Sequence, residues 1–109
     1  KLFPDMFTPD ERGHAGAEET SVNLALHPHL VNMGRAVDEE VRGHVAEAEG
    51  VVLPLDTADR TSSGVFGKST TASEDKGKRV FEAVVNELVK HINLLKKARI
   101  EDLMAKLRI

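Results

Sequence analysis

The chain has 109 residues, which fits one small domain and is too short for two. Aromatic residues make up only 4% of it and its formal net charge is −3, so we expect neither nucleic acid nor an anionic membrane as a partner. It has no cysteine, which excludes disulfides, thiolate zinc sites and thiol nucleophiles and agrees with a cytoplasmic location.

The first elements in chain order are a loop and a helix. Residues 1–13 are expected to form a loop or a loose turn, because Pro4 and Pro9 interrupt them. Apolar residues at near-helical spacing predict a helix over residues 16–26. Pro28 ends this helix, because it lacks the amide hydrogen that a continuing helix would use, and it can begin a short turn.

The middle of the chain is predicted to contain little regular structure. Val51-Val52-Leu53 is a β-branched run before Pro54 and is expected to be an edge strand or a short extended segment. Residues 56–71 are rich in Ser, Thr, Gly and Asp and predict an irregular surface loop. One short strand cannot cover the helices, so the chain needs a sheet that it does not contain.

A long helix is predicted over residues 72–97. Thr71 and Glu74 fit a capping box at its start, with Thr71 as the N-cap. An apolar stripe follows at four- and three-residue spacing, and we expect it to be core rather than a partner-binding face. Its members are Val80, Val84, Leu88, Ile92 and Leu95. The tail, residues 98–109, continues this spacing as an extension or a second short helix.

His14 is the candidate residue for proton transfer. It lies between small residues that leave room for a substrate, and an imidazole can donate or accept a proton near neutral pH. Glu19 follows five positions later. It faces away from His14 if both residues are helical, and can turn toward it if His14 precedes the helix. The alternative for His14 is an exposed histidine at a helix start.

Two other motifs are weaker candidates. His27 and His29 have the spacing of a metal-ligating pair, but Pro28 separates them and no third ligand is apparent nearby. The segment Gly67-Lys68-Ser69 imitates the end of a phosphate-binding loop, but Ser62 occupies the position where the motif requires glycine. Neither motif is expected to carry the function.

Two longer patterns carry a family resemblance. The first is His14-Ala15-Gly16-x-x-Glu19-Thr20-Ser21, followed by Leu24-Ala25-Leu26-x-Pro28-x-Leu30-Val31. The second is Gly64-x-x-Gly67-x-Ser69-x-x-Ala72-x-x-x-x-Gly77. They resemble the C-terminal signature and the glycine-containing loop of the creatininase family of metal-dependent amidohydrolases, and the similarity covers roughly residues 12–93.

The resemblance implies an α/β fold, with a mostly parallel sheet in a three-layer α/β/α arrangement that usually forms homo-oligomers. Residues 1–109 would be the C-terminal segment of one such domain, with the signature and its helix at residues 14–33. The family's divalent metal ions (Zn, Mn or Fe) are bound upstream of this region, so an N-terminal segment of the same enzyme is an expected partner. By position, His14 is the family's catalytic histidine and Glu19 is its signature carboxylate.

The expected function is hydrolysis of a C–N bond in a small-molecule amide, of the cyclic amide or formamide type. Members that act on creatinine carry Glu directly before the histidine and Trp shortly before it, where this chain has Gly13 and Asp10, so creatinine itself is a doubtful substrate. The alternative is a non-catalytic helical module that binds a protein partner through the last helix and the tail.

Overall fold

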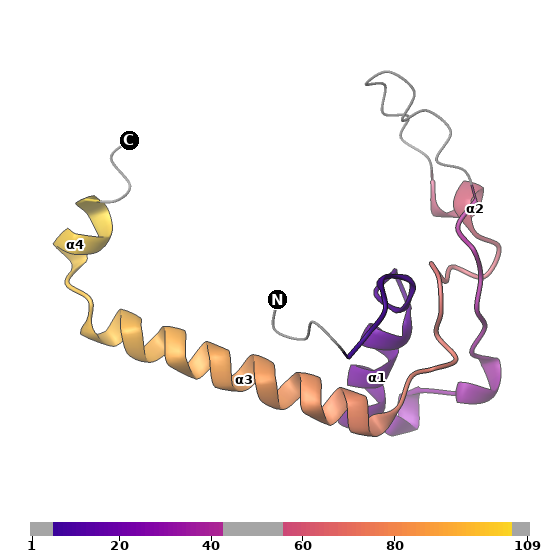
Figure 1. Cartoon of the computed structure of the whole chain (residues 1–109), viewed down its shortest axis with the longest axis horizontal. Helices are drawn as coiled ribbons and strands as arrows, with labels where there is room; N and C mark the ends of the chain where they lie inside the picture. Colours follow the sequence, from indigo (N-terminus) through magenta and orange to yellow (C-terminus); the bar gives the residue numbers. More distant parts are fainter. Residues whose placement is uncertain (1–5, 43–55, 106–109) are drawn as a thin grey trace, which may run out of the picture.

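The computed structural model describes residues 6–42 and 56–105, and this part of the chain is mostly helical (Figure 1). In chain order the elements are η1 (Pro9–Glu11), α1 (Ala17–Leu26), η2 (Pro28–Leu30), η3 (Met33–Arg35), α2 (Thr57–Arg60), α3 (Glu74–Lys97) and α4 (Ile100–Ala105). The only β-type pairing in the described ranges is an isolated antiparallel bridge between Glu39 and Gly67. The expected segment Val51-Val52-Leu53 lies outside the described residues.

The helix predicted over residues 16–26 is confirmed as α1. Gly16 is its N-cap, and Glu18 and Glu19 lie in its first turn, where acidic side chains suit the helix dipole. The helix ends at Leu26, and His27 takes a non-helical conformation before Pro28. Pro28 opens a short 3₁₀ turn, η2, as the sequence predicts.

The long helix α3 begins two residues later than predicted. Its N-cap is Ser73, whose hydroxyl oxygen accepts a hydrogen bond from Lys76 N at 3.3 Å. The prediction of Thr71 as N-cap is wrong, because the Thr71 hydroxyl donates to the carboxylate of Glu11. The tail contains a separate short helix, α4, because the chain leaves the helical conformation at Ala98.

The other difference from the predicted elements is a single helical turn, α2, inside the 56–71 loop. Asp56 and Asp59 form a capping box around it. The remainder of this loop, up to the start of α3, is irregular as expected.

The helices α1 and α3 cross at a glycine. A Cβ at Gly77 would lie 1.8 Å from the carbonyl oxygen of Ser21, so only glycine permits this approach. Ser21 is fully buried there and accepts a hydrogen bond from Ser73 N at 3.0 Å. Beside this crossing lies a small core of Phe7, Ala17 and Val80, with Met6, Val22 and Ala72 packed against it.

Most of α3 extends away from this crossing (Figure 1). Of the apolar stripe expected to form the core, only Val80 is buried, and Leu88 is 57% exposed. The reason is geometric, because α1 covers only the first turns of α3. None of the helices in the described ranges combines the length and hydrophobicity that a membrane span requires.

Candidate active site around His14

His14 lies in a tight turn between η1 and α1. The turn is closed by a hydrogen bond from Gly16 N to the Gly13 carbonyl at 2.9 Å. The imidazole is exposed and meets the Phe66 ring edge to face, with ring centroids 6.0 Å apart and planes at 81°. The His14 carbonyl accepts a hydrogen bond from Phe66 N at 2.9 Å. Phe66 therefore contacts both the backbone and the side chain of the candidate residue.

The glycine-containing loop runs beside the His14 turn. Lys68 links the two segments, since its amide donates to the Asp10 carbonyl at 2.8 Å and its carbonyl accepts from Ala17 N at 2.7 Å. Gly67 has a φ of +98°, and a Cβ there would lie 2.1 Å from the Asp10 oxygen. The two patterns that carry the family resemblance, about 50 residues apart in sequence, are thus in direct contact.

Ala15 has an unusual backbone conformation directly after His14. Its φ is +53°, the left-handed region that an L-residue with a Cβ rarely occupies. Its amide donates to the carboxylate of Glu19 at 2.8 Å, and its carbonyl accepts from the Thr20 hydroxyl at 3.3 Å. The structure therefore brings Glu19 to the backbone beside His14. The hydrogen bonds found in the described part do not join Glu19 to the imidazole.

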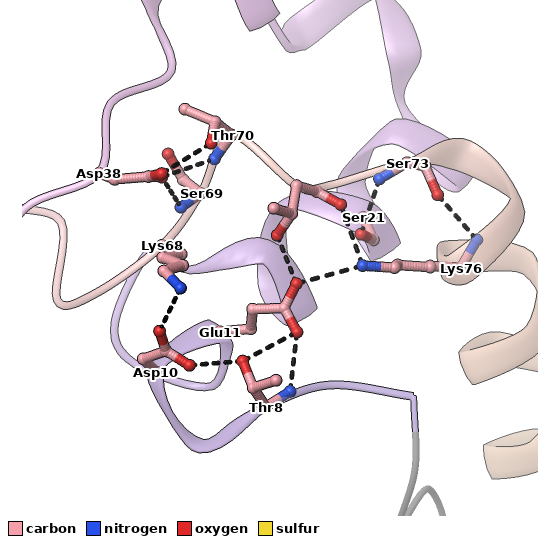
Figure 2. Close-up of polar contacts among 11 residues, drawn as sticks. Thr8, Asp10, Glu11, Ser21, Asp38, Lys68, Ser69, Thr70, Ser73 and Lys76 are labelled. Carbon is pink, nitrogen blue, oxygen red and sulfur yellow. Dashed lines mark hydrogen bonds and ion pairs between the residues drawn. The ribbon is translucent and has the colours of Figure 1, made fainter.

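A buried carboxylate anchors the segment that leads into the His14 turn (Figure 2). Glu11 is 7% exposed and accepts hydrogen bonds from Thr8 N at 2.7 Å, from the Thr71 hydroxyl and from Lys76 Nζ at 3.2 Å. The Thr71 hydroxyl and the Thr8 amide are the main causes that lower the pKa of Glu11 from 4.5 to about 2. The Lys76 ammonium also lies 5.2 Å from the centre of the Phe7 ring. Glu11 thus joins η1 to α3 as an anion.

Asp38 holds the end of the glycine-containing loop (Figure 2). Its carboxylate accepts from Ser69 N at 2.9 Å, from Thr70 N at 3.0 Å and from the Thr70 hydroxyl at 2.8 Å. These bonds, led by the Thr70 amide, lower the pKa of Asp38. An ion pair between Asp10 and Lys68, 2.8 Å long, adds a second link, and it is the first cause of a pKa of about 2 for Asp10.

Glu39 closes the other side of the same loop. Its carboxylate accepts from the amides of Ser62 at 2.7 Å and Ser63 at 2.9 Å, and from the Thr61 hydroxyl at 2.7 Å. The pKa of Glu39 falls well below its usual range, with the Ser62 amide as the largest cause. Glu39 is therefore fully engaged by this chain as a structural anion.

An open cleft of about 650 Å³ lies between these segments. Its lining is made of Pro9, Asp10, Gly13, Asp38, Glu39, Glu40, Val41, Phe66, Gly67 and Lys68. His14 is not part of this lining, although its neighbour Gly13 and its contact Phe66 are. Glu19 lines a second hollow of about 520 Å³ on the side of α1 and α3.

The described residues do not fit a divalent metal centre by themselves. Within residues 6–42 and 56–105, no group of three His, Cys, Asp or Glu side chains is arranged to hold a metal ion. The carboxylates of Glu11, Asp38 and Glu39 are occupied by hydrogen bonds from this chain. The rings of His27 and His29 lie edge to face, with centroids 6.3 Å apart.

The anchoring carboxylates Glu11, Asp38 and Glu39 were not expected from the sequence. Their main partners lie 22 to 65 residues away along the chain, as in the bonds from Thr61 to Glu39 and from Lys76 to Glu11. No local pattern reports such pairings. The dense Ser and Thr content of the 56–71 loop was the one available signal, because hydroxyls and turn amides are good carboxylate partners.

Comparison with known proteins defines the class of this chain. The creatininase family, described as creatinine amidohydrolase, matches residues 5–92. A creatinine amidohydrolase of Pseudomonas putida is 34% identical over 85 residues, which cover 78% of this chain and 32% of that protein. A mutant creatininase complexed with creatine superposes with a TM-score of 0.67 at 32% identity, covering 89% of this chain and 37% of that chain. A structure described as Creatininase Mn gives a TM-score of 0.62 at 31% identity, covering 76% and 31%.

The fold is that of α/β amidohydrolase relatives, although the described residues contribute helices and no strand. This chain belongs to the creatininase family, and the family resemblance of the His14 and glycine-loop patterns is confirmed. The chain spans about a third of the length of these relatives.

Proposed function

We propose that this chain is the C-terminal part of a metal-dependent amidohydrolase that cleaves a C–N bond in a small-molecule amide. His14 is its proton donor. The observation that carries this proposal is the fixed presentation of His14: the turn that bears it is held from both sides, and its imidazole remains exposed. Membership of the creatininase family supplies the reaction class.

The chemistry requires an acid beside the departing nitrogen. An amide nitrogen is a poor leaving group as an anion, so it must be protonated as the C–N bond breaks. An imidazole titrates near neutral pH and can give this proton at low cost, which typically contributes about 10²–10⁴-fold in rate. His14 Nδ1 or Nε2 would donate this proton to the nitrogen as the C–N bond breaks. The oxygen of the attacking water would form the new C–O bond, and the proton that this water releases would restore the proton on the ring.

Divalent metal ions are proposed to be bound by residues other than the described ones. The relative described as Creatininase Mn supports a metal-dependent enzyme. This chain covers 31% of that relative, and the part that it does not cover can supply the metal ligands. An N-terminal segment of the same enzyme would also enclose His14, which is exposed in this chain. We also propose that the enzyme assembles into homo-oligomers and that it is located in the cytoplasm.

The substrate is proposed to be a cyclic amide or a formamide other than creatinine. Creatinine-hydrolysing members carry Glu before the histidine, and this chain has Gly13. A Cβ on Gly13 would lie 1.8 Å from the Phe66 carbonyl oxygen, so the backbone that supports His14 leaves no room for Glu there. The packing of this turn against Phe66 therefore requires Gly at position 13, where the creatinine-hydrolysing members carry Glu.

The direct test is an assay of the native protein, as it occurs in its host, against cyclic amides and formamides with divalent metal added. We expect hydrolysis of at least one class, and a fall in kcat of about 10²–10⁴-fold in His14→Ala. Metal content should remain unchanged. An active His14→Ala protein, within threefold of the parent, would remove the assignment.

A protein-interaction module is the second candidate, because the apolar face of α3 is exposed. Val84, Leu88 and Ile92 are each more than 40% exposed in the described part of the chain. This candidate predicts a native protein without hydrolase activity whose α3 binds another protein. Amide hydrolysis that depends on His14 would decide against it.

A further inference from the structure

We infer that Glu19 is a positioning residue which acts on His14 by holding Ala15 in the left-handed conformation, together with Thr20. The inference rests on the proposed function of His14 and extends it to the device that aims the imidazole. Glu19 itself needs no contact with substrate.

Ala15 has a backbone conformation that is energetically unfavourable for an L-residue. At φ +53° the Cβ of an L-residue crowds the adjacent carbonyl, and glycine is the residue that adopts this region freely. Alanine offers no side-chain hydrogen bond to compensate. Something else must hold Ala15 in place, because backbone outliers persist only where their surroundings over-determine them.

The second observation identifies what holds it. Glu19 accepts the Ala15 amide hydrogen at 2.8 Å, and Thr20 donates to the Ala15 carbonyl at 3.3 Å. Both polar groups of this one residue are thus bound by consecutive side chains in the first turn of α1. The arrangement is a capping box shifted by one residue, since Glu19 is the third helical residue after the N-cap Gly16 yet reaches back to Ala15.

The consequence for His14 follows from its place in the chain. The His14 carbonyl is fixed by Phe66 N at 2.9 Å, and the next peptide unit is fixed by Glu19. Rotation about the Ala15 backbone would change the path between His14 and α1. Small misplacements of a catalytic group lower kcat strongly while affecting substrate binding little.

Two substitutions of Glu19 distinguish whether its side chain acts as a hydrogen-bond acceptor or through its negative charge. Gln at position 19 keeps an acceptor for the Ala15 amide, so we expect Glu19→Gln to retain kcat within about threefold, with an unshifted pH profile. Glu19→Ala loses the acceptor and should lower kcat by about 10- to 100-fold with KM within twofold. Glu18→Ala is the matched control, because it removes the neighbouring acid in the same helical turn, and it should leave kcat unchanged.

A glycine at position 15 removes the conformational cost of the left-handed backbone and so provides the decisive comparison. In the Ala15→Gly background the left-handed conformation no longer depends on Glu19, so Glu19→Ala should then cost less than about threefold in kcat. Hydrogen exchange of the Ala15 amide in the native protein should accelerate at least tenfold in Glu19→Ala, which tests the hydrogen bond without any assay of activity.

Two results would overturn the inference. One is an equal loss of kcat in Glu19→Gln and Glu19→Ala that Ala15→Gly does not relieve, which would mean that Glu19 acts through its charge. The other is unchanged exchange of the Ala15 amide in Glu19→Ala. Failure of the proposed function is distinguishable, because it would appear as a native protein without hydrolase activity or as a His14→Ala protein within threefold of the parent. Exchange of the Ala15 amide tests the Glu19 hydrogen bond in either case.

Discussion

Gly77 of α3 lies against Ser21 of α1 so closely that a Cβ at position 77 would stand 1.8 Å from the Ser21 carbonyl oxygen. The contact sets the crossing of the two helices. It also sets the position of the His14 turn, because α1 begins directly after that turn.

Gly77→Ala is therefore expected to destabilise the fold by about 1–3 kcal/mol, through overpacking at the crossing. Helix propensity alone predicts the opposite sign, a gain of up to about 1 kcal/mol. Denaturant unfolding of the native protein measures the difference. Gly34→Ala is the control, since a Cβ there meets only the Asn32 side chain at 3.1 Å, and a stabilised Gly77→Ala protein would contradict the crossing described.

Local signals in the sequence predicted the two main helices well and their contacts poorly. The α3 stripe and the α1 pattern gave boundaries within two residues, because periodicity and caps are local properties. The N-cap assignment failed at Thr71, since its hydroxyl is taken by Glu11, 60 residues away. A contact of that range leaves no mark in the neighbouring sequence.

Glu11 is expected to make the stability of the fold pH-dependent. Its pKa is lowered from 4.5 to about 2, so its contribution is present above pH 4.5 and is lost as the pH falls toward 2. Glu11→Gln should cost about 1.5–3 kcal/mol at pH 7, the usual range for hydrogen bonds to a charged group. The difference from the parent should shrink toward zero near pH 2.

Denaturant unfolding at several pH values between 2 and 7 checks this prediction. The exposed Glu82 provides the control, and Glu82→Gln should shift stability by less than about 0.5 kcal/mol. A constant difference between Glu11→Gln and the parent across this pH range would show that the ionised form of Glu11 is not what stabilises the fold.

Gly13→Glu is expected to damage the protein rather than create creatinine hydrolysis. The clash with the Phe66 carbonyl begins at the Cβ, so Gly13→Ala should be impaired as well. Both variants should lose at least tenfold in kcat on the native substrate as the His14 turn is displaced. Creatinine turnover by a stable Gly13→Glu protein would show that the packing tolerates the residue of the creatinine-hydrolysing members.

Residues 1–109 alone are expected not to bind zinc or manganese stoichiometrically. The reason is that no group of three His, Cys, Asp or Glu side chains in residues 6–42 and 56–105 is arranged to hold a metal ion, and that Asp38 is engaged by Thr70. Metal analysis after dialysis of the isolated chain measures this, with the native protein as the positive control. One bound ion per isolated chain would contradict the prediction and would direct attention to His27 and His29.

The candidate site was only partly readable from sequence. His14 could be singled out because imidazole chemistry and small neighbours are visible in the residues themselves. The sequence left open whether Glu19 turns toward His14, and the structure shows it bonded to the amide of the next residue. The positive φ of Ala15 could not be predicted from the sequence, because alanine rarely adopts it, whereas a glycine at position 15 would have suggested a left-handed backbone.

If His14 protonates the departing nitrogen, the rate should depend on the leaving group in a way that changes when the imidazole is removed. kcat should be measured for the parent and His14→Ala with amides that share one acyl group and differ in the basicity of the amine. We expect His14→Ala to lose about 10²–10⁴-fold in kcat for strongly basic alkylamines and at most about tenfold for nitroaniline, which leaves without a proton donor. A loss of the same size for both leaving groups would contradict the proton-donor role of His14.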